Sequence, residues 1–127
     1  ALVLLGCDVR VGADIDCKIG LNEVAIGMVL PDWAFTIAVA RLSNRHLQRS
    51  VATARITDAA SAVDVGYLDE VVAAEDVLDT AVACAADFAA LHPGAYSGTV
   101  QKLRGDVISA MADEIAADRA AGAIPTA

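Results

Sequence analysis

Residues Lys18–Gly27 read KIGLNEVAIG and place a single carboxylate, Glu23, among mostly apolar side chains. The first four residues of this segment predict a short strand or an extended piece of chain. Gly20 and Gly27 disfavour a regular helix around the glutamate. No basic residue lies nearer to Glu23 along the chain than Lys18. The segment therefore presents an acidic group without a neighbouring cation.

A carboxylate in such surroundings is a candidate general acid or base if the fold buries it, because burial prepares carboxyl groups for proton transfer near neutral pH. Glu23 is the residue that the sequence singles out for chemistry. The alternative is a surface carboxylate at the end of a strand. Local sequence alone leaves both readings open.

The chain around this segment alternates between extended and helical patterns. Apolar and polar residues alternate over Cys7–Gly12, which predicts a strand. Pro31 suits the first turn of a helix that continues to Val39. Ser43 is a favourable N-cap for the next helix.

The second half of the chain is expected to be mainly helical. Thr57 or Asp58 caps a short helix that stops at Gly66, and Tyr67–Val72 predicts a strand or extended edge. A long helix is expected over about 74–91 because apolar residues recur at helical spacing there.

The segment His92-Pro93-Gly94 then predicts a helix break, with His92 at the C-terminal end of the preceding helix. A last helix is expected over about 97–120, with a break at Gly105, and residues 121–126 are expected to fray.

Composition limits the function classes. The chain has 127 residues, which suits one domain, and its formal net charge of −8 argues against a nucleic-acid partner. The apolar opening Ala1–Leu5 is too short to span a bilayer, so no membrane partner is expected. It predicts the end of a buried helix, and we expect the chain to be the C-terminal part of a longer one. The mean hydropathy of +0.54 predicts apolar surface that meets another subunit.

Other polar residues give weaker signals. The three cysteines have no paired spacing, which predicts reduced thiols and no metal site. His46 is expected to have a structural role. Arg41, Arg45 and Arg49 recur every four residues, which predicts a basic stripe on one helix that pairs with carboxylates or contacts a phosphate.

Three segments of the chain carry a family resemblance: Cys7–Val11, the string Gly20-Leu21-Asn22-Glu23, and residues 58–72. Together they resemble the crotonase superfamily of enoyl-CoA hydratases and isomerases. The resemblance covers roughly residues 1 to 120. It implies an α/β, crotonase-like fold (the ClpP/crotonase ββα spiral), of which this chain is the C-terminal part with a helical oligomerisation region. Residues 1–72 would belong to the spiral core and residues 73–127 to the helical region.

The resemblance also implies a role for Glu23. In the family, a glutamate at this position faces the acyl-CoA near its α and β carbons, and two backbone N–H groups hold the thioester carbonyl and stabilise the enolate. Hydratases use two glutamates, and the first would fall at Leu2, which transfers no proton. The residues therefore fit the single-glutamate Δ3,Δ2-enoyl-CoA isomerases better, although the name hydratase is applied loosely in the family.

The expected ligand is an acyl-CoA thioester, with coenzyme A as part of the substrate and no separate cofactor. Leu30, Trp33 and Phe35 are candidates for the acyl pocket, because Trp33 follows Pro31 where hydratases usually have a glycine-rich turn. Both oxyanion-hole N–H groups would lie ahead of Ala1.

The resemblance further implies a homo-oligomer, a trimer or hexamer, and we expect a cytoplasmic location. Other crotonase-fold chemistry, such as thioester hydrolysis or decarboxylation, stays open. The alternative of another class is a catalytically inactive truncated remnant or assembly module that keeps the oligomerising helices.

Overall fold

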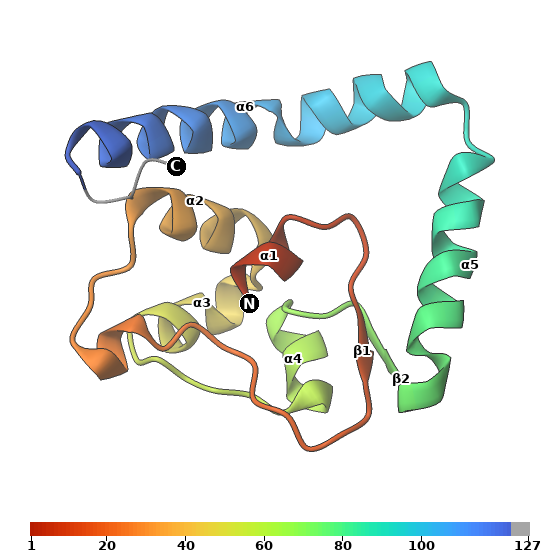
Figure 1. Ribbon diagram of the computed structural model, residues 1–127, viewed down its shortest axis with the longest axis horizontal. Coiled ribbons are helices and arrows are strands. Elements are labelled where there is room, and N and C mark those ends of the chain that lie inside the picture. Colours follow the sequence, from red (N-terminus) through yellow and green to blue (C-terminus); the bar gives the residue numbers. More distant parts are fainter. Residues whose placement is uncertain (123–127) are drawn as a thin grey trace.

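The computed structural model describes residues 1–122, and Figure 1 shows how their elements are arranged. The bounds of the helices and strands are α1 (Leu2–Leu5), β1 (Val11–Ala13), the 3-10 helix η1 (Glu23–Ile26), α2 (Asp32–Arg41), α3 (Asn44–Val51), α4 (Ala59–Val65), β2 (Glu70–Val72), the 3-10 helix η2 (Ala74–Asp76), α5 (Val77–Ala89) and α6 (Pro93–Ala120). The sequence predicts a frayed end over residues 121–126, and the part of it from position 123 onward lies outside the described residues.

Two short strands form a parallel sheet. Val11 of β1 lies opposite Glu70 of β2, and Ala13 lies opposite Val72. Parallel neighbours need a crossover connection, and here η1, α2, α3 and α4 all belong to it. Ile19 and Thr57 form an isolated antiparallel bridge within this connection. Of the short strand or extended segment expected over Lys18–Leu21, only Ile19 forms a β-bridge.

The core lies between the crossover helices and the start of the chain. Its most deeply buried members include Leu5 of α1, Ala34 and Ala38 of α2, Val65 of α4, and Tyr67. Apolar burial of this kind supplies most of the stability of a small domain. The core therefore fixes the segment between β1 and α2, which carries Glu23.

The helix-capping predictions for α3 and α4 are confirmed in position. Ser43 is the N-cap of α3, although its side chain makes no capping hydrogen bond. The Asp58 carboxylate accepts a hydrogen bond of 2.7 Å from the Ser61 backbone N–H at the start of α4. Gly66 ends α4 with a left-handed φ of 98°, a conformation that glycine adopts readily.

Three sequence predictions about the helices and strands are wrong. The strand expected over Cys7–Gly12 is limited to Val11–Ala13, because the residues before it turn, and Cys7 N–H donates to the Leu4 carbonyl. His92 does not end the preceding helix: it is the N-cap of α6, and its Nδ1 accepts a hydrogen bond of 3.3 Å from Ala95 N–H. Consequently α6 begins at Pro93 and continues through Gly105 without the expected break.

The last two helices differ from the rest of the fold. Neither α5 nor α6 contains a buried residue. Figure 1 shows α6 running along α2 and α5 descending beside the two strands. Several of their apolar side chains are exposed, with Leu78 and Leu103 both 71% exposed, whereas Met111 of α6 packs against the core. The expected division between residues 1–72 and 73–127 follows this difference in burial but stays a prediction.

Candidate active site

Glu23 is the first residue of η1. The Leu21 side chain just before it is buried in the core, with 3% of its surface exposed. Gly27 ends this single turn in a left-handed conformation, with φ of 78°. The backbone of the segment is closed by a hydrogen bond of 2.9 Å from Met28 N–H to the Glu23 carbonyl. The position of the glutamate is therefore set by a buried anchor on one side and a tight turn on the other.

The Glu23 carboxylate is half-buried and incompletely paired. Its Oε2 atom is buried, and no hydrogen-bond partner for it occurs among residues 1–122. Buried polar atoms are usually paired, so this unpaired oxygen is available to bind a ligand or to accept a proton. The Oε2 atom of Glu114 is likewise buried and unpaired among residues 1–122.

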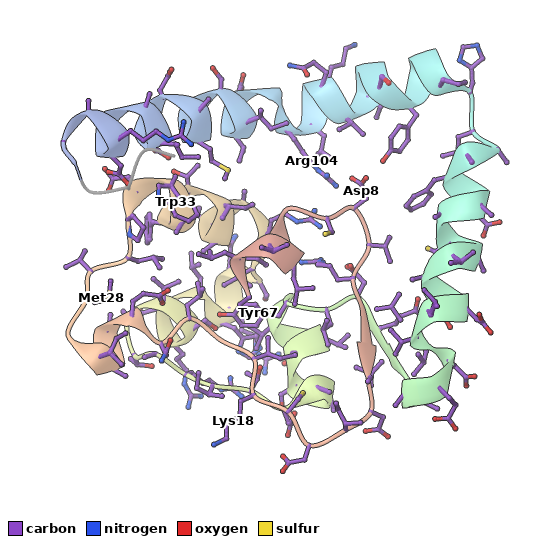
Figure 2. The ribbon with its side chains drawn as sticks, viewed as in Figure 1. Asp8, Lys18, Met28, Trp33, Tyr67 and Arg104 are labelled. Atoms are coloured by element: carbon purple, nitrogen blue, oxygen red, sulfur yellow. The ribbon has the colours of Figure 1, made fainter. Side chains whose placement is uncertain are left out.

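Two buried hydroxyl groups accompany the glutamate. Tyr67 and Ser50 are both fully buried, and within the described chain neither hydroxyl completes a hydrogen bond. Burial raises the pKa of Tyr67, and the negative charge of Glu23 raises this pKa further. The nearby Ser50 hydroxyl and Leu21 backbone lower it in part. The charge effect places Glu23 within electrostatic reach of Tyr67, whose central position Figure 2 shows.

Sequence patterns did not single out these hydroxyl groups. Ser50 lies four positions after His46 on α3, and both are buried, so the i, i+4 spacing of polar residues on one helix face was the available signal. Tyr67 directly follows Gly66, which ends α4.

An apolar cavity of about 450 Å³ adjoins the segment that carries Glu23. Val24, Gly27 and Met28 line it from this segment, and Leu30 and Phe35 line it from the start of α2 and the loop before it. Two of the three residues predicted for the acyl pocket thus meet at one cavity. Neither Trp33 nor the Glu23 side chain lines it.

The other candidate residues are dispersed. Arg41 ends α2, whereas Arg45 and Arg49 are exposed on α3, so the predicted basic stripe on one helix is wrong. The chain turns into an extended conformation at Leu42 between the two helices. His46 is buried, and its Nε2 lies 2.8 Å from Oδ2 of Asp64, an arrangement that fits the structural role expected of it.

Metal-binding clusters and membrane-spanning helices are absent from residues 1–122. Residues 1–122 hold no group of three or more His, Cys, Asp or Glu side chains placed to bind a metal ion. In the same residues no helix combines the length and the apolar character needed to cross a bilayer.

The family is decided by a match over most of the chain. The family model described as enoyl-CoA hydratase/isomerase matches residues 1–122. The chain belongs to the enoyl-CoA hydratase/isomerase family. Its fold is accordingly the C-terminal part of the crotonase fold, and the family expected from the Gly20–Glu23 string is confirmed.

Individual relatives of this enoyl-CoA hydratase/isomerase family member agree. The human protein named enoyl-CoA delta isomerase 1, mitochondrial, is 32% identical over 119 residues, which cover 92% of this chain and 39% of the human protein. A crystal structure of an enoyl-CoA hydratase/isomerase family protein from Pseudomonas syringae superposes with a TM-score of 0.88 at 34% identity, covering 93% of this chain and 51% of that one.

Human mitochondrial delta3-delta2-enoyl-CoA isomerase superposes with a TM-score of 0.82 at 30% identity over 90% of this chain and 45% of that one. The present chain therefore spans about half the length of these solved structures, and a smaller share of the curated human relative.

Proposed function

We propose that this family member moves a proton beside an acyl-CoA thioester, as an enoyl-CoA isomerase, and that Glu23 is the acid–base group. The observation that carries the proposal is the buried Oε2 atom of Glu23, which has no hydrogen-bond partner among residues 1–122 and belongs to the segment that lines the apolar cavity. The similarity to proteins named as isomerases supports the same reading.

The proposed reaction needs only one carboxylate. Glu23 takes a proton from C2 of a 3-enoyl-CoA, and the C–H electron pair moves into the thioester carbonyl to give an enolate conjugated with the C3–C4 double bond. The Glu23 carboxylic acid then returns the proton to C4, which shifts the double bond to C2–C3 and restores both the carbonyl and the carboxylate. Hydration would need a second acid–base group, and the position expected for it holds Leu2.

The acyl group is proposed to occupy the cavity of about 450 Å³, with Leu30 and Phe35 in contact with it. Ligand sites of this size are common, and an apolar lining suits an acyl chain. Trp33, the third predicted pocket residue, would contribute only if the substrate extends past the cavity lining. Coenzyme A enters as part of the substrate, and no separate cofactor is proposed.

Assembly and location are proposed as the sequence predicts them. A trimer or hexamer would cover the exposed apolar residues of α5 and α6, such as Leu78 and Leu103. Light scattering of the natural protein checks the oligomer number, and a monomer would overturn it. The cytoplasmic location stays a prediction, and the name of the human relative includes the word mitochondrial.

The decisive experiment compares Glu23→Gln with the unchanged protein, both in the natural full-length form. We expect isomerisation of a 3-enoyl-CoA to fall about 10³-fold, because a positioned acid–base group contributes 10²–10⁴-fold. Glu75→Gln, at an exposed position of η2, is the matched control and keeps full activity. Unchanged isomerisation in Glu23→Gln would overturn the role of Glu23, and efficient hydration of a 2-enoyl-CoA would overturn the isomerase assignment.

A further inference from the structure

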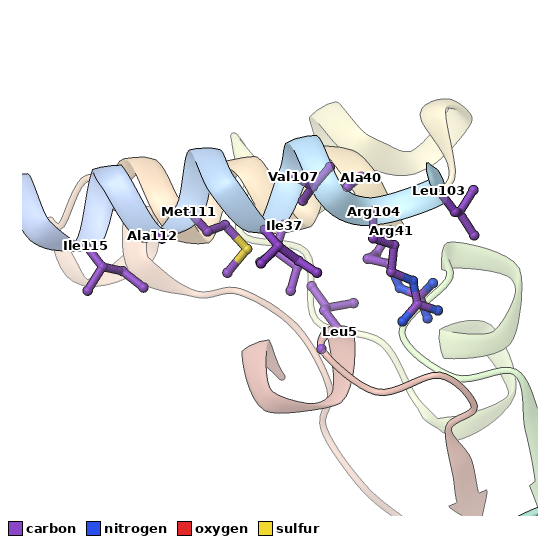
Figure 3. Close-up of a pocket in the computed structure, with 12 residues that line it drawn as sticks. Leu5, Ile37, Ala40, Arg41, Leu103, Arg104, Val107, Met111, Ala112 and Ile115 are labelled. Atoms are coloured by element: carbon purple, nitrogen blue, oxygen red, sulfur yellow. The ribbon is translucent and has the colours of Figure 1, made fainter. Parts of the chain in front are cut away.

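A second cavity, of about 460 Å³, lies between α1, α2 and α6. It shares no lining residue with the cavity beside Glu23. Figure 3 shows Leu5 and Ile37 near its middle and Met111 and Ile115 toward one end. These side chains are apolar, and they give the cavity an apolar wall to which α1, α2 and α6 all contribute.

The opposite end of this cavity is cationic. Figure 3 shows the guanidinium groups of Arg41 and Arg104 next to one another there. Arg104 forms an ion pair with Asp8. Arg41 instead donates 2.8 Å and 3.5 Å hydrogen bonds to the backbone carbonyls of Cys7 and Asp8. Within residues 1–122 Arg41 forms no ion pair with a carboxylate.

The surroundings leave the charge of Arg41 incompletely balanced. Arg10 is paired with Asp69 and Arg104 with Asp8, so three guanidinium groups share two carboxylates. Burial lowers the pKa of Arg41, the positive charges of Arg10 and Arg104 lower it further, and the two carboxylates only partly offset them. The Nε atoms of Arg41 and Arg104 are buried and unpartnered among the described residues.

We propose that this cavity binds a free linear aliphatic acid, with its hydrocarbon chain between α2 and α6 and its carboxylate against Arg41. An apolar wall with one cationic end matches an amphipathic anion, and the volume lies in the range of small-molecule sites. A carboxylate accepts charge-assisted hydrogen bonds from a guanidinium. A thioester carbonyl lacks this charge, so the site selects the free acid. The proposal does not depend on the role of Glu23.

The test uses the natural full-length protein and sodium decanoate below its micelle concentration, with binding measured by isothermal titration calorimetry. We expect saturable binding of decanoate and at least tenfold weaker binding of 1-decanol, which keeps the chain and lacks the charge. Equal binding of 1-decanol would overturn the carboxylate contact, and an absence of decanoate binding would overturn the site.

Two matched pairs of variants locate the binding. Arg41→Gln is expected to weaken decanoate binding about tenfold or more, because a hydrogen bond to a charged group contributes about 1.5–3 kcal/mol. Arg49→Gln removes an exposed arginine of α3 and is expected to change nothing. Equal affinity in Arg41→Gln and the unchanged protein would overturn the role of Arg41.

The second pair fills one cavity at a time. Ala112→Phe places a ring in the cavity beside Arg41 from an exposed position of α6, and Ala52→Phe does the same in the cavity beside Glu23. We expect decanoate binding to be lost in Ala112→Phe and kept in Ala52→Phe. The reverse result would put the acid in the other cavity and overturn the proposal. Because Ala112 is exposed, this variant stays informative even if Arg41→Gln fails to fold.

Discussion

Arg10 and Asp69 join the two parallel strands by a pair of side-chain hydrogen bonds. Nε and Nη2 of Arg10 donate to Oδ2 and Oδ1 of Asp69, each at 2.8 Å, and the Arg10 backbone N–H donates to Oδ2 at the same distance. Nη1 of Arg10 also donates to the Gly66 carbonyl at 2.6 Å. One buried guanidinium thus connects the start of β1 to both the end of α4 and the start of β2.

Asp69→Asn is expected to lower the free energy of unfolding by about 2 kcal/mol. Breaking a buried ion pair costs about 3–5 kcal/mol, and the loss is smaller here because the Asp69 side chain is 40% exposed. Urea unfolding measures the change. Asp79→Asn, at an exposed position of α5, is the matched control and should stay within about 0.5 kcal/mol of the unchanged protein. Equal stability of the two variants would contradict the expectation.

Stability should decrease in acid. The hydrogen bond from the Arg10 side chain, with the Arg10 charge, holds the pKa of Asp69 below its usual range. The group therefore stabilises the fold fully above the unfolded value of about 3.9 and loses this contribution as pH falls through the lower folded value. Thermal unfolding between about pH 5 and pH 2 measures it. The curve for Asp69→Asn should be flatter in this window, and a parallel curve would contradict the assignment.

Gly66→Ala is expected to destabilise the protein more than Gly27→Ala. Both glycines have left-handed φ angles, which cost a residue with a Cβ about 1–2 kcal/mol. A Cβ at Gly66 would also lie 3.0 Å from the Arg41 carbonyl oxygen, whereas a Cβ at Gly27 would meet nothing within 4 Å. The difference between the two unfolding free energies isolates the steric contribution. No difference would show that α4 and α2 adjust freely.

Tyr67→Phe is expected to leave the free energy of unfolding unchanged or raise it by up to about 1 kcal/mol, because the buried hydroxyl completes no hydrogen bond within the described residues. Thr57→Val is the control with the opposite expected sign, because the buried Thr57 hydroxyl donates a hydrogen bond of 2.9 Å to the Ile19 carbonyl. Urea unfolding of both variants checks the signs. A clear loss of stability in Tyr67→Phe would mean that its hydroxyl is satisfied in the folded protein.

Local signals predicted the crossover helices well. The Asp58 cap and the Gly66 stop are properties of a few adjacent residues, so the sequence alone locates α4. The limits of β1 were missed because they depend on Asp69, which is remote in the sequence. The start of α6 was missed because Gly94 and Gly98 weaken the helical pattern, whereas Pro93 is favourable at the first helical position.

The site was predictable in its central residue and less so in its surroundings. Glu23 stands out by its apolar neighbours, but the buried Tyr67 hydroxyl, with Ser50 beside it, comes within electrostatic reach of Glu23 only through tertiary packing. The sequence prediction placed Trp33 and Phe35 in one acyl pocket, and the geometry of the helix that carries both does not allow this. Residues two positions apart on a helix are about 160° apart around its axis, so Trp33 and Phe35 point to nearly opposite sides of α2 and only Phe35 lines the cavity.

The Arg10–Asp69 connection also bears on the rate of folding. The two residues are 59 positions apart, and contacts between distant residues form slowly because the intervening chain must first lose conformational entropy. The crossover helices, whose contacts are more local, are expected to form before the sheet. The parallel ladder is then expected to close last, and loss of this ion pair is expected to speed its opening.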